Sequence, residues 1–318
     1  MKNDLTVKDY FQGIKNRDRS VLAKAITLIE SSNPEHQKKA RSLLKEIIPL
    51  TGKSKRIGIS GTPGVGKSTF LENFGMHLIG EGNSIAVLAI DPTSQITGGS
   101  ILGDKTRMQE LSVHENAFVR PSPNGNSLGG VASKTREAML LCDAFGFDII
   151  FIETVGVGQS EIAVANIVDF FILLMQPGSG DELQGIKRGI LEVSDLVVVN
   201  KADGNQLASA KVAQHDYKRS LEVLQEKNVW ETSVLLCSSL KKTGFTEIGS
   251  NIEKYFSEYF DIKARESQTK TWLKELIVQR FKDDLLSDEL VDEQIADLIA
   301  KQGDLLEGIN QIYIGLKK

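Results

Sequence analysis

The residues from Gly61 to Thr69 carry the strongest chemical signal in the chain. They fit the pattern of a phosphate-binding loop, in which glycine is followed by four residues, glycine, lysine and serine or threonine. The glycines let the backbone turn tightly and bring N–H groups close to phosphate oxygens, and the helix that follows adds its positive end. Lys67 would reach the β- and γ-phosphates, and the hydroxyl of Ser68 would bind Mg²⁺. The predicted nucleotide-binding residues of this loop are Gly61, Thr62, Pro63, Gly64, Val65, Gly66, Lys67, Ser68 and Thr69.

A second motif runs from Asn200 to Asp203 and matches the pattern Asn-Lys-x-Asp of guanine-binding proteins. Guanine presents two adjacent donors, its N1–H and its exocyclic amine, and the carboxylate of Asp203 can accept both, which adenine cannot match. Lys201 would lay its aliphatic stem over the base, and Asn200 would brace the loop. Backbone N–H groups after the next predicted strand would contact guanine O6, at Ser238, Ser239 and Leu240. GTP and GDP are therefore the predicted nucleotides.

Acidic residues at the ends of predicted strands mark the expected metal side of the site. Glu153 is placed to hold Mg²⁺, commonly through water, and the N–H of Gly156 is placed to sense the γ-phosphate. Asp91 could reach the metal or its waters, and Asp104 is either a metal-side ligand or the N-cap of a helix. The expected metal residues are Ser68, Asp91, Asp104 and Glu153, and the expected catalytic residues are Lys67, Glu153 and Asp104.

No residue stands out as a water-orienting group or an arginine finger. Gln159 is displaced from the usual position of a catalytic glutamine, which favours a solvated or partner-facing residue, and Arg107 is expected to pair with an acidic neighbour. The glycine-rich loop 177–188 is predicted to respond to the nucleotide or to a partner, with Lys187 and Arg188 as phosphate contacts or as surface cations. Slow intrinsic GTP hydrolysis, accelerated by a partner, follows from this pattern.

The apolar pattern of the chain predicts an α/β fold. Strand candidates alternate with helical patterns at 56–60, 84–90, 148–153, 169–175, 195–200 and 232–237. Several are near-continuous apolar runs, which indicate strands covered by helices on both faces and hence a doubly wound, mostly parallel sheet. Ligands of such sheets bind beyond the carboxyl ends of the strands, where the motifs above lie.

Helical spacing of apolar residues flanks this pattern on both sides. We expect an N-terminal helical extension over 1–52, a nucleotide-binding domain over 53–262, and a C-terminal helical arm over 263–318. The arm carries three apolar stripes, which begin near Trp272, Leu290 and Leu305. Packing on its own domain and a subunit interface are both open for this arm.

Composition excludes several classes of protein. The 318 residues carry a net charge of −4, which argues against nucleic-acid binding because no basic stripe is available. The two cysteines, Cys142 and Cys237, lie in apolar runs and are expected to be buried and reduced. No targeting segment and no apolar run of about 18 residues is visible, so a cytoplasmic protein without membrane contact is expected.

Three phrases of the sequence resemble the MeaB/ArgK family of P-loop GTPases, within the metallochaperone group. They run from Gly58 to Thr69, from Glu153 to Ser160, and from Gly185 to Ile190. The resemblance implies a homodimeric metallochaperone, with the C-terminal helices in the dimer contact. Its GTP cycle would gate adenosylcobalamin delivery to an acyl-CoA mutase, typically methylmalonyl-CoA mutase, and protect that enzyme. The loops 92–108, 154–160 and 177–188 would be three switches, the third coupling to the mutase.

Other functions remain open at this point. A maturation GTPase for another metalloenzyme would be expected to carry His- or Cys-rich tracts, and the chain has four His and two Cys. A small-molecule kinase or ATPase on the same loop usually prefers ATP, against which the guanine motif argues. A non-hydrolysing binding module would be recognised by its failure to release phosphate.

Overall fold

The computed structural model describes residues 5–91, 108–123, 128–154, 160–178, 188–224 and 230–286. The chain divides into two compact units, Met1–Ile262 and Lys263–Lys318. Several residues predicted from the sequence lie outside the described residues, namely Asp104, Arg107, Gly156, Gln159 and Lys187. The second and third apolar stripes of the C-terminal arm also lie outside them.

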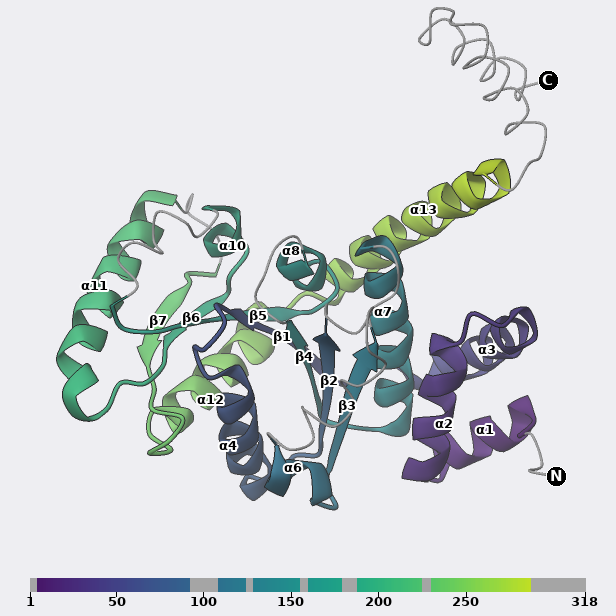
Figure 1. Cartoon of the computed structure of the whole chain (residues 1–318), viewed down its shortest axis with the longest axis horizontal. Coiled ribbons are helices and arrows are strands. Elements are labelled where there is room, and N and C mark those ends of the chain that lie inside the picture. The colour runs from purple at the N-terminus through teal and green to yellow at the C-terminus, as the bar shows by residue number, and fades with distance from the viewer. Residues whose placement is uncertain are drawn as a thin grey trace, which may run out of the picture. The chain divides into compact units, whose positions relative to one another are not determined.

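A seven-stranded sheet forms the centre of the first unit, in the order β3-β2-β4-β1-β5-β6-β7 (Figure 1). Every neighbouring pair is parallel, which confirms the doubly wound α/β prediction. The strands are β1 Lys55–Gly61, β2 Ile85–Asp91, β3 Ala117–Pro123, β4 Ile149–Thr154, β5 Phe170–Met175, β6 Leu196–Val199 and β7 Ser233–Leu236.

One strand was absent from the sequence prediction. Strand β3 lies at the edge of the sheet, and among the described strands it pairs with β2 alone, from Ala117 opposite Ile85 to Pro123 opposite Asp91. Its second half contains Pro121 and Pro123, which lack the N–H that a central strand needs. An edge strand tolerates them, because the side of its backbone that faces no neighbour needs no ladder hydrogen bond.

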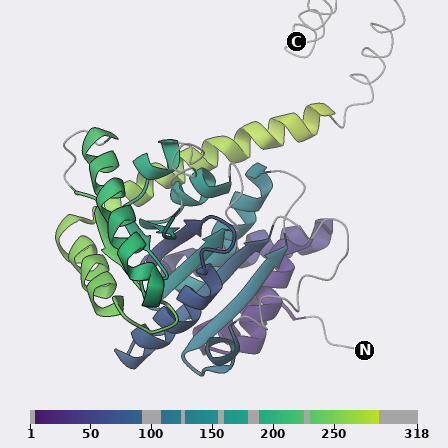
Figure 2. The same ribbon diagram turned by 60° about the vertical axis from the view of Figure 1, so that its left-hand side comes forward.

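Helices cover both faces of the sheet (Figures 1 and 2). Apolar side chains such as Ile57 and Phe151 meet α4, α6 and α12 on one face. Side chains of alternate strand positions, such as Phe171, meet α7 and α8 on the other face, and Val197 meets α10 and α11 there. This alternation explains why the strands read as continuous apolar runs. The helices are α1 Val7–Lys15, α2 Arg19–Glu30, α3 Pro34–Ile47, α4 Lys67–Gly80, α6 Gln109–Val113, α7 Leu128–Phe145, α8 Ser160–Ala165, α10 Arg188–Glu192, α11 Leu207–Leu224, α12 Phe245–Lys254 and α13 Ile262–Leu286.

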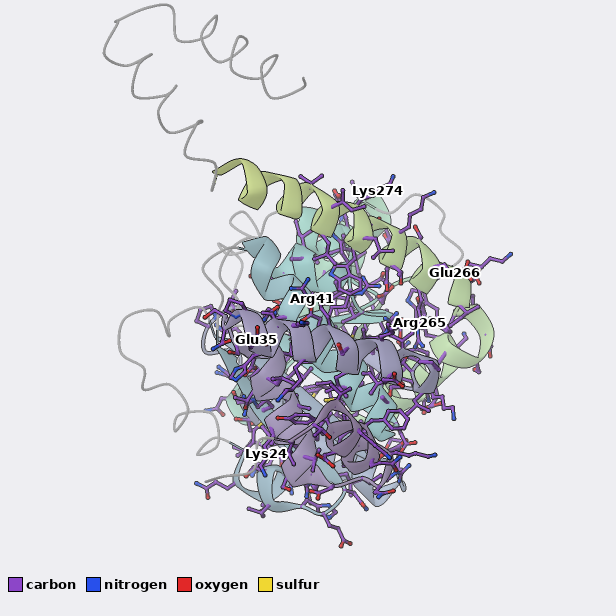
Figure 3. All side chains as sticks on the ribbon, turned by 90° about the vertical axis from the view of Figure 1, so that its right-hand side faces the viewer. Lys24, Glu35, Arg41, Arg265, Glu266 and Lys274 are labelled. Atoms are coloured by element: carbon purple, nitrogen blue, oxygen red, sulfur yellow. The ribbon has the colours of Figure 1, made fainter. Side chains whose placement is uncertain are left out.

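The N-terminal helices α1–α3 extend the core beyond the edge strand by packing on α7. Each begins after a polar cap residue, Thr6, Asp18 or Asn33, whose side-chain oxygen accepts a backbone N–H of the first turn. Their outer surface carries exposed charged side chains, among them Lys24, Glu35 and Arg41 (Figure 3). These helices therefore share one hydrophobic core with the sheet.

Two further expectations can be compared with the described residues. Both cysteines are buried free thiols, as predicted. Burial raises the pKa of Cys142, and it raises the pKa of Cys237 to about 12, so neither is poised as a thiolate. Within the described ranges, no helix combines the length and the apolar character that a membrane crossing requires.

Candidate functional site

The phosphate-binding loop joins the end of β1 to the start of α4, as the sequence predicts. Gly61 has φ +154°, and a Cβ there would collide with the carbonyl oxygen of Leu174 on β5. Gly66 has φ +96° and caps α4, and a Cβ there would lie 2.9 Å from the side-chain nitrogen of Asn200. Both positions therefore require glycine, because the backbone is left-handed and the space is occupied.

Lys67 lies with its ammonium inside this loop. Its Nζ donates to the carbonyl oxygens of Gly61 at 2.6 Å and Thr62 at 3.2 Å. An ammonium has three donors, so a third remains for a phosphate oxygen. Burial lowers the pKa of Lys67, while the negative charges of Glu153 and Glu161 act in the opposite direction.

The expected metal side brings together Ser68 and Glu153. The hydroxyl of Ser68 donates to Glu153 Oε1 at 3.3 Å, and Glu153 is buried at the end of β4. Next to it, the hydroxyl of Thr154 donates to the hydroxyl of Ser60 at 2.9 Å, which ties β4 to β1 beneath the site. Asp91 ends the neighbouring strand β2, so the backbone places it at the same edge, while its side chain lies outside the described part.

Asn200 connects the two motifs that the sequence identified separately. Its Nδ2 donates to the carbonyl oxygen of Val65 in the phosphate-binding loop at 2.9 Å. Its Oδ1 accepts the backbone N–H of Ser239 at 3.0 Å and the hydroxyl of Ser239 at 2.8 Å. With 2 % exposure, this amide is a fixed joint between the phosphate side and the base side. The bracing role expected of Asn200 thus has a definite geometry.

The other residues of the second motif surround the same joint. Lys201 has φ +57°, and its Nζ donates to the carbonyl oxygen of Gly64 at 2.6 Å and to Gln176 Oε1 at 2.9 Å. Asp203 accepts a hydrogen bond from the hydroxyl of Ser238, which holds the carboxylate at the end of β7. Leu240 is 74 % exposed, so it adds no buried packing to this loop.

Two residues of this region, Gln176 and Glu161, were not singled out from the sequence. Gln176 holds Lys201, and Thr62 of the predicted loop carries a buried hydroxyl without a hydrogen-bond partner in the described part of the chain. Glu161 on α8 is 6 % exposed, and its Oε2 also lacks a partner there. The only signal for Glu161 is its spacing of three residues from Val164, which places both on one helix face.

Comparisons with known proteins identify relatives of this chain. A family model described as methylmalonyl Co-A mutase-associated GTPase MeaB matches residues 22–294. The GTPase ArgK of Escherichia coli is 45% identical over 297 residues, covering 92% of this chain and 90% of that protein. The methylmalonic aciduria type A homolog of Mus musculus, described as mitochondrial, is 42% identical over 309 residues, 92% of this chain and 74% of that protein.

Solved structures show the same fold. A structure described as LAO/AO transport system kinase is 35% identical to this chain and has a TM-score of 0.78. The match covers 100% of this chain and 100% of that chain. HypB from Helicobacter pylori, in complex with nickel, is 19% identical with a TM-score of 0.51, covering 71% of this chain and 97% of its own. The likeness to HypB shows the fold alone.

Proposed function

The chain belongs to the MeaB family of P-loop GTPases, and on that premise we propose that it uses GTP binding and hydrolysis to gate the delivery of adenosylcobalamin to an acyl-CoA mutase and to protect that enzyme. Methylmalonyl-CoA mutase is the proposed client. The printed description of the family model and the name of the mouse relative support this choice. The cytoplasmic location expected from the sequence stays a prediction.

The nucleotide proposal is carried by the joint at Asn200. One buried amide contacts the phosphate-binding loop at Val65 and the base-side loop at Ser239, so both halves of a guanine nucleotide site are set relative to each other. We assign Asp203 to the N1–H and amine of guanine and Lys201 to the face of the base. Because the N–H of Ser239 is engaged by Asn200, the N–H of Leu240 is the donor we assign to guanine O6.

Mg²⁺ is the proposed metal, and the described donors fit it. Ser68 and Glu153 offer a hydroxyl and a carboxylate, which are the oxygen ligands that Mg²⁺ prefers, and Asp91 lies at the same edge. Among the described residues no group of three His, Cys, Asp or Glu could enclose a metal. Mg²⁺ is commonly held through one or two carboxylates together with the phosphates of the nucleotide. When bound, Mg²⁺ would neutralise charge on the phosphates.

The remaining catalytic work is done by the chain itself. Lys67 and the backbone N–H groups of the phosphate-binding loop stabilise charge on the transferred phosphoryl group. No arginine finger or water-orienting residue is assigned, and Asp104 stays a predicted contributor. We therefore propose slow intrinsic hydrolysis that a partner accelerates. A turnover of the free protein above about 1 s⁻¹ would overturn this part of the proposal.

The C-terminal arm, 263–318, is proposed as the dimer contact. Its described part, α13, carries large apolar side chains that are about half exposed, at Leu273, Ile277 and Val278. Such a surface on a single chain favours coverage by a second copy. Sedimentation of the full chain and of a variant with Leu273→Lys and Ile277→Lys tests it, because a dimer that becomes monomeric is expected.

The client proposal is tested by calorimetric titration with cobalamin-dependent mutases. The protein is titrated against each mutase with a GTP analogue, with GDP and without nucleotide. Binding to one mutase that depends on the nucleotide is expected. Absence of binding in every state would leave a GTPase with a different client and return the maturation-GTPase alternative to the front.

A further inference from the structure

Glu161 is a buried carboxylate that the site described above does not use. It lies on α8 with 6 % exposure, and its Oε2 has no hydrogen-bond partner within the described residues. No cation of the described chain lies within ion-pair distance of it. A buried carboxylate without a partner is costly, so the oxygen is expected to meet a ligand.

The backbone places this carboxylate beside the phosphate-binding loop. Helix α8 packs against β1 and β4. Val164 of α8 covers Gly58, where a Cβ would lie 3.1 Å from its Cγ1. Glu161 precedes Val164 by three residues on the same helix face, in the direction of the carboxyl end of β1. That strand ends at Gly61, whose carbonyl oxygen holds Lys67.

The buried charges around Lys67 disfavour the binding of a phosphate without a cation. Lys67 supplies one positive charge, and Glu153 and Glu161 supply two negative charges, so these three buried groups sum to −1. Their mutual influence is visible in Lys67, whose pKa both carboxylates act to raise. An incoming phosphate is repelled by this net charge unless a divalent cation arrives with it.

We propose that Glu161 is a positioning residue that makes nucleotide binding depend on Mg²⁺. Its buried oxygen accepts a hydrogen bond from a water molecule of the ion's hydration shell, and its charge opposes nucleotide binding when the ion is missing. The inference rests on the proposed Mg²⁺–GTP function and adds a carboxylate to it. It concerns binding, so it can be measured without hydrolysis.

The test compares the affinity for GDP and for a non-hydrolysable GTP analogue in excess Mg²⁺ and in EDTA. The wild type, Glu161→Gln and the matched control Glu192→Gln are titrated. Glu192 is an exposed carboxylate at the end of α10 and has no role in the site. Glu161→Gln is expected to bind nucleotide about tenfold more tightly in EDTA and to lower the Mg²⁺-to-EDTA affinity ratio by about tenfold. Glu192→Gln should leave that ratio unchanged.

Outcomes separate this inference from the proposed function. A wild type that binds no guanine nucleotide would overturn the function itself. A wild type that binds nucleotide with Mg²⁺, and a Glu161→Gln variant with the same affinity ratio, would overturn only the inference. Glu161→Met guards against a folding defect, because removing an unpaired buried charge is expected to raise the Tm and to lower the ratio equally. A lower Tm for Glu161→Met would show that the carboxylate is satisfied structurally and would also overturn the inference.

Discussion

At the amino ends of the strands (the amino edge of the sheet), aspartate carboxylates accept backbone N–H groups at the start of neighbouring strands. At the carboxyl ends (the carboxyl edge), polar atoms remain available. Asp169 accepts the N–H of Arg56 at 3.0 Å and also pairs with its guanidinium. Asp195 accepts the N–H of Phe171 at 2.8 Å, and Asp148 accepts the N–H of Ser84 at 2.8 Å. At the other edge, Thr62 Oγ1 and Glu161 Oε2 have no partner in the described structure.

The loops at the carboxyl edge are tied to one another by side chains. Left-handed backbone occurs near both edges, at Gly52, Gly82 and Gly146 before strands and at Gly64, Gly66 and Lys201 after them. At the carboxyl edge, the loops that carry these residues are held by single side chains such as Asn200. Backbone that is strained in this way persists where the surrounding structure enforces it and is typical of functional sites. The amino edge therefore joins neighbouring strands, whereas the carboxyl edge leaves polar atoms for the proposed nucleotide.

The largest effect is expected at the carboxyl edge from Lys67→Ala. Loss of this ammonium removes a donor to the transferred phosphoryl group, so kcat for GTP hydrolysis should fall about 10²–10³-fold. Stability should change little, because burial already opposes the charge and lowers the pKa of Lys67. Phosphate release and thermal unfolding measure the two effects. A large loss of stability with retained hydrolysis would assign Lys67 to the structure rather than the reaction.

The next effect concerns the left-handed backbone of the phosphate-binding loop. Gly66→Ala places a Cβ 2.9 Å from Asn200 Nδ2 at φ +96°, so the free energy of unfolding should fall by about 2 kcal/mol or more. Gly80→Ala is the matched control, because nothing lies within 4 Å of a Cβ there and α4 gains about 0.5–1 kcal/mol. Urea unfolding measures both. Equal stabilities of the two variants would contradict the claim that position 66 requires glycine.

A smaller effect is expected at the amino edge, from Asp195→Asn. Burial raises the pKa of Asp195 from 3.8 to about 7, so the folded protein keeps a proton that the unfolded chain releases between these values. The free energy of unfolding of the wild type therefore falls as the pH rises from about 4 to about 7, because of this one carboxyl group. Asn keeps an acceptor for Phe171 and does not titrate. Relative to the wild type, the free energy of unfolding of the variant should rise by roughly 2 kcal/mol between pH 5 and pH 8. Urea unfolding at both pH values measures this difference. A difference that is the same at both pH values would contradict the prediction.

Much of the fold could be predicted because local and global signals agree. Four of the six predicted strands, β1, β4, β5 and β6, are buried on both faces, so their apolar runs carry the signal directly. Strand β3 was missed because only Phe118 and Val119 interrupt a polar, proline-containing segment. Its place depends on pairing with β2, which no pattern within the segment records.

The site shows the same division between local and distant information. The residues from Gly61 to Thr69 and from Asn200 to Asp203 are fixed by spacing, so the sequence identifies them. The bond from Asn200 to Val65 joins residues far apart in the chain, and only the fold reveals it. The burial of Glu161 likewise depends on how α8 lies over β1, so the sequence alone makes it look like an exposed helix residue.

The carboxyl edge of the sheet is proposed to select guanine. The most direct test is a calorimetric titration of the wild type and of Asp203→Asn with GDP, ADP and XDP in excess Mg²⁺. The wild type should bind GDP and discriminate against ADP by at least about 10²-fold, and Asp203→Asn should lose GDP and gain XDP, because xanthine replaces the amine with an acceptor. Equal binding of ADP and GDP by the wild type would contradict the claim.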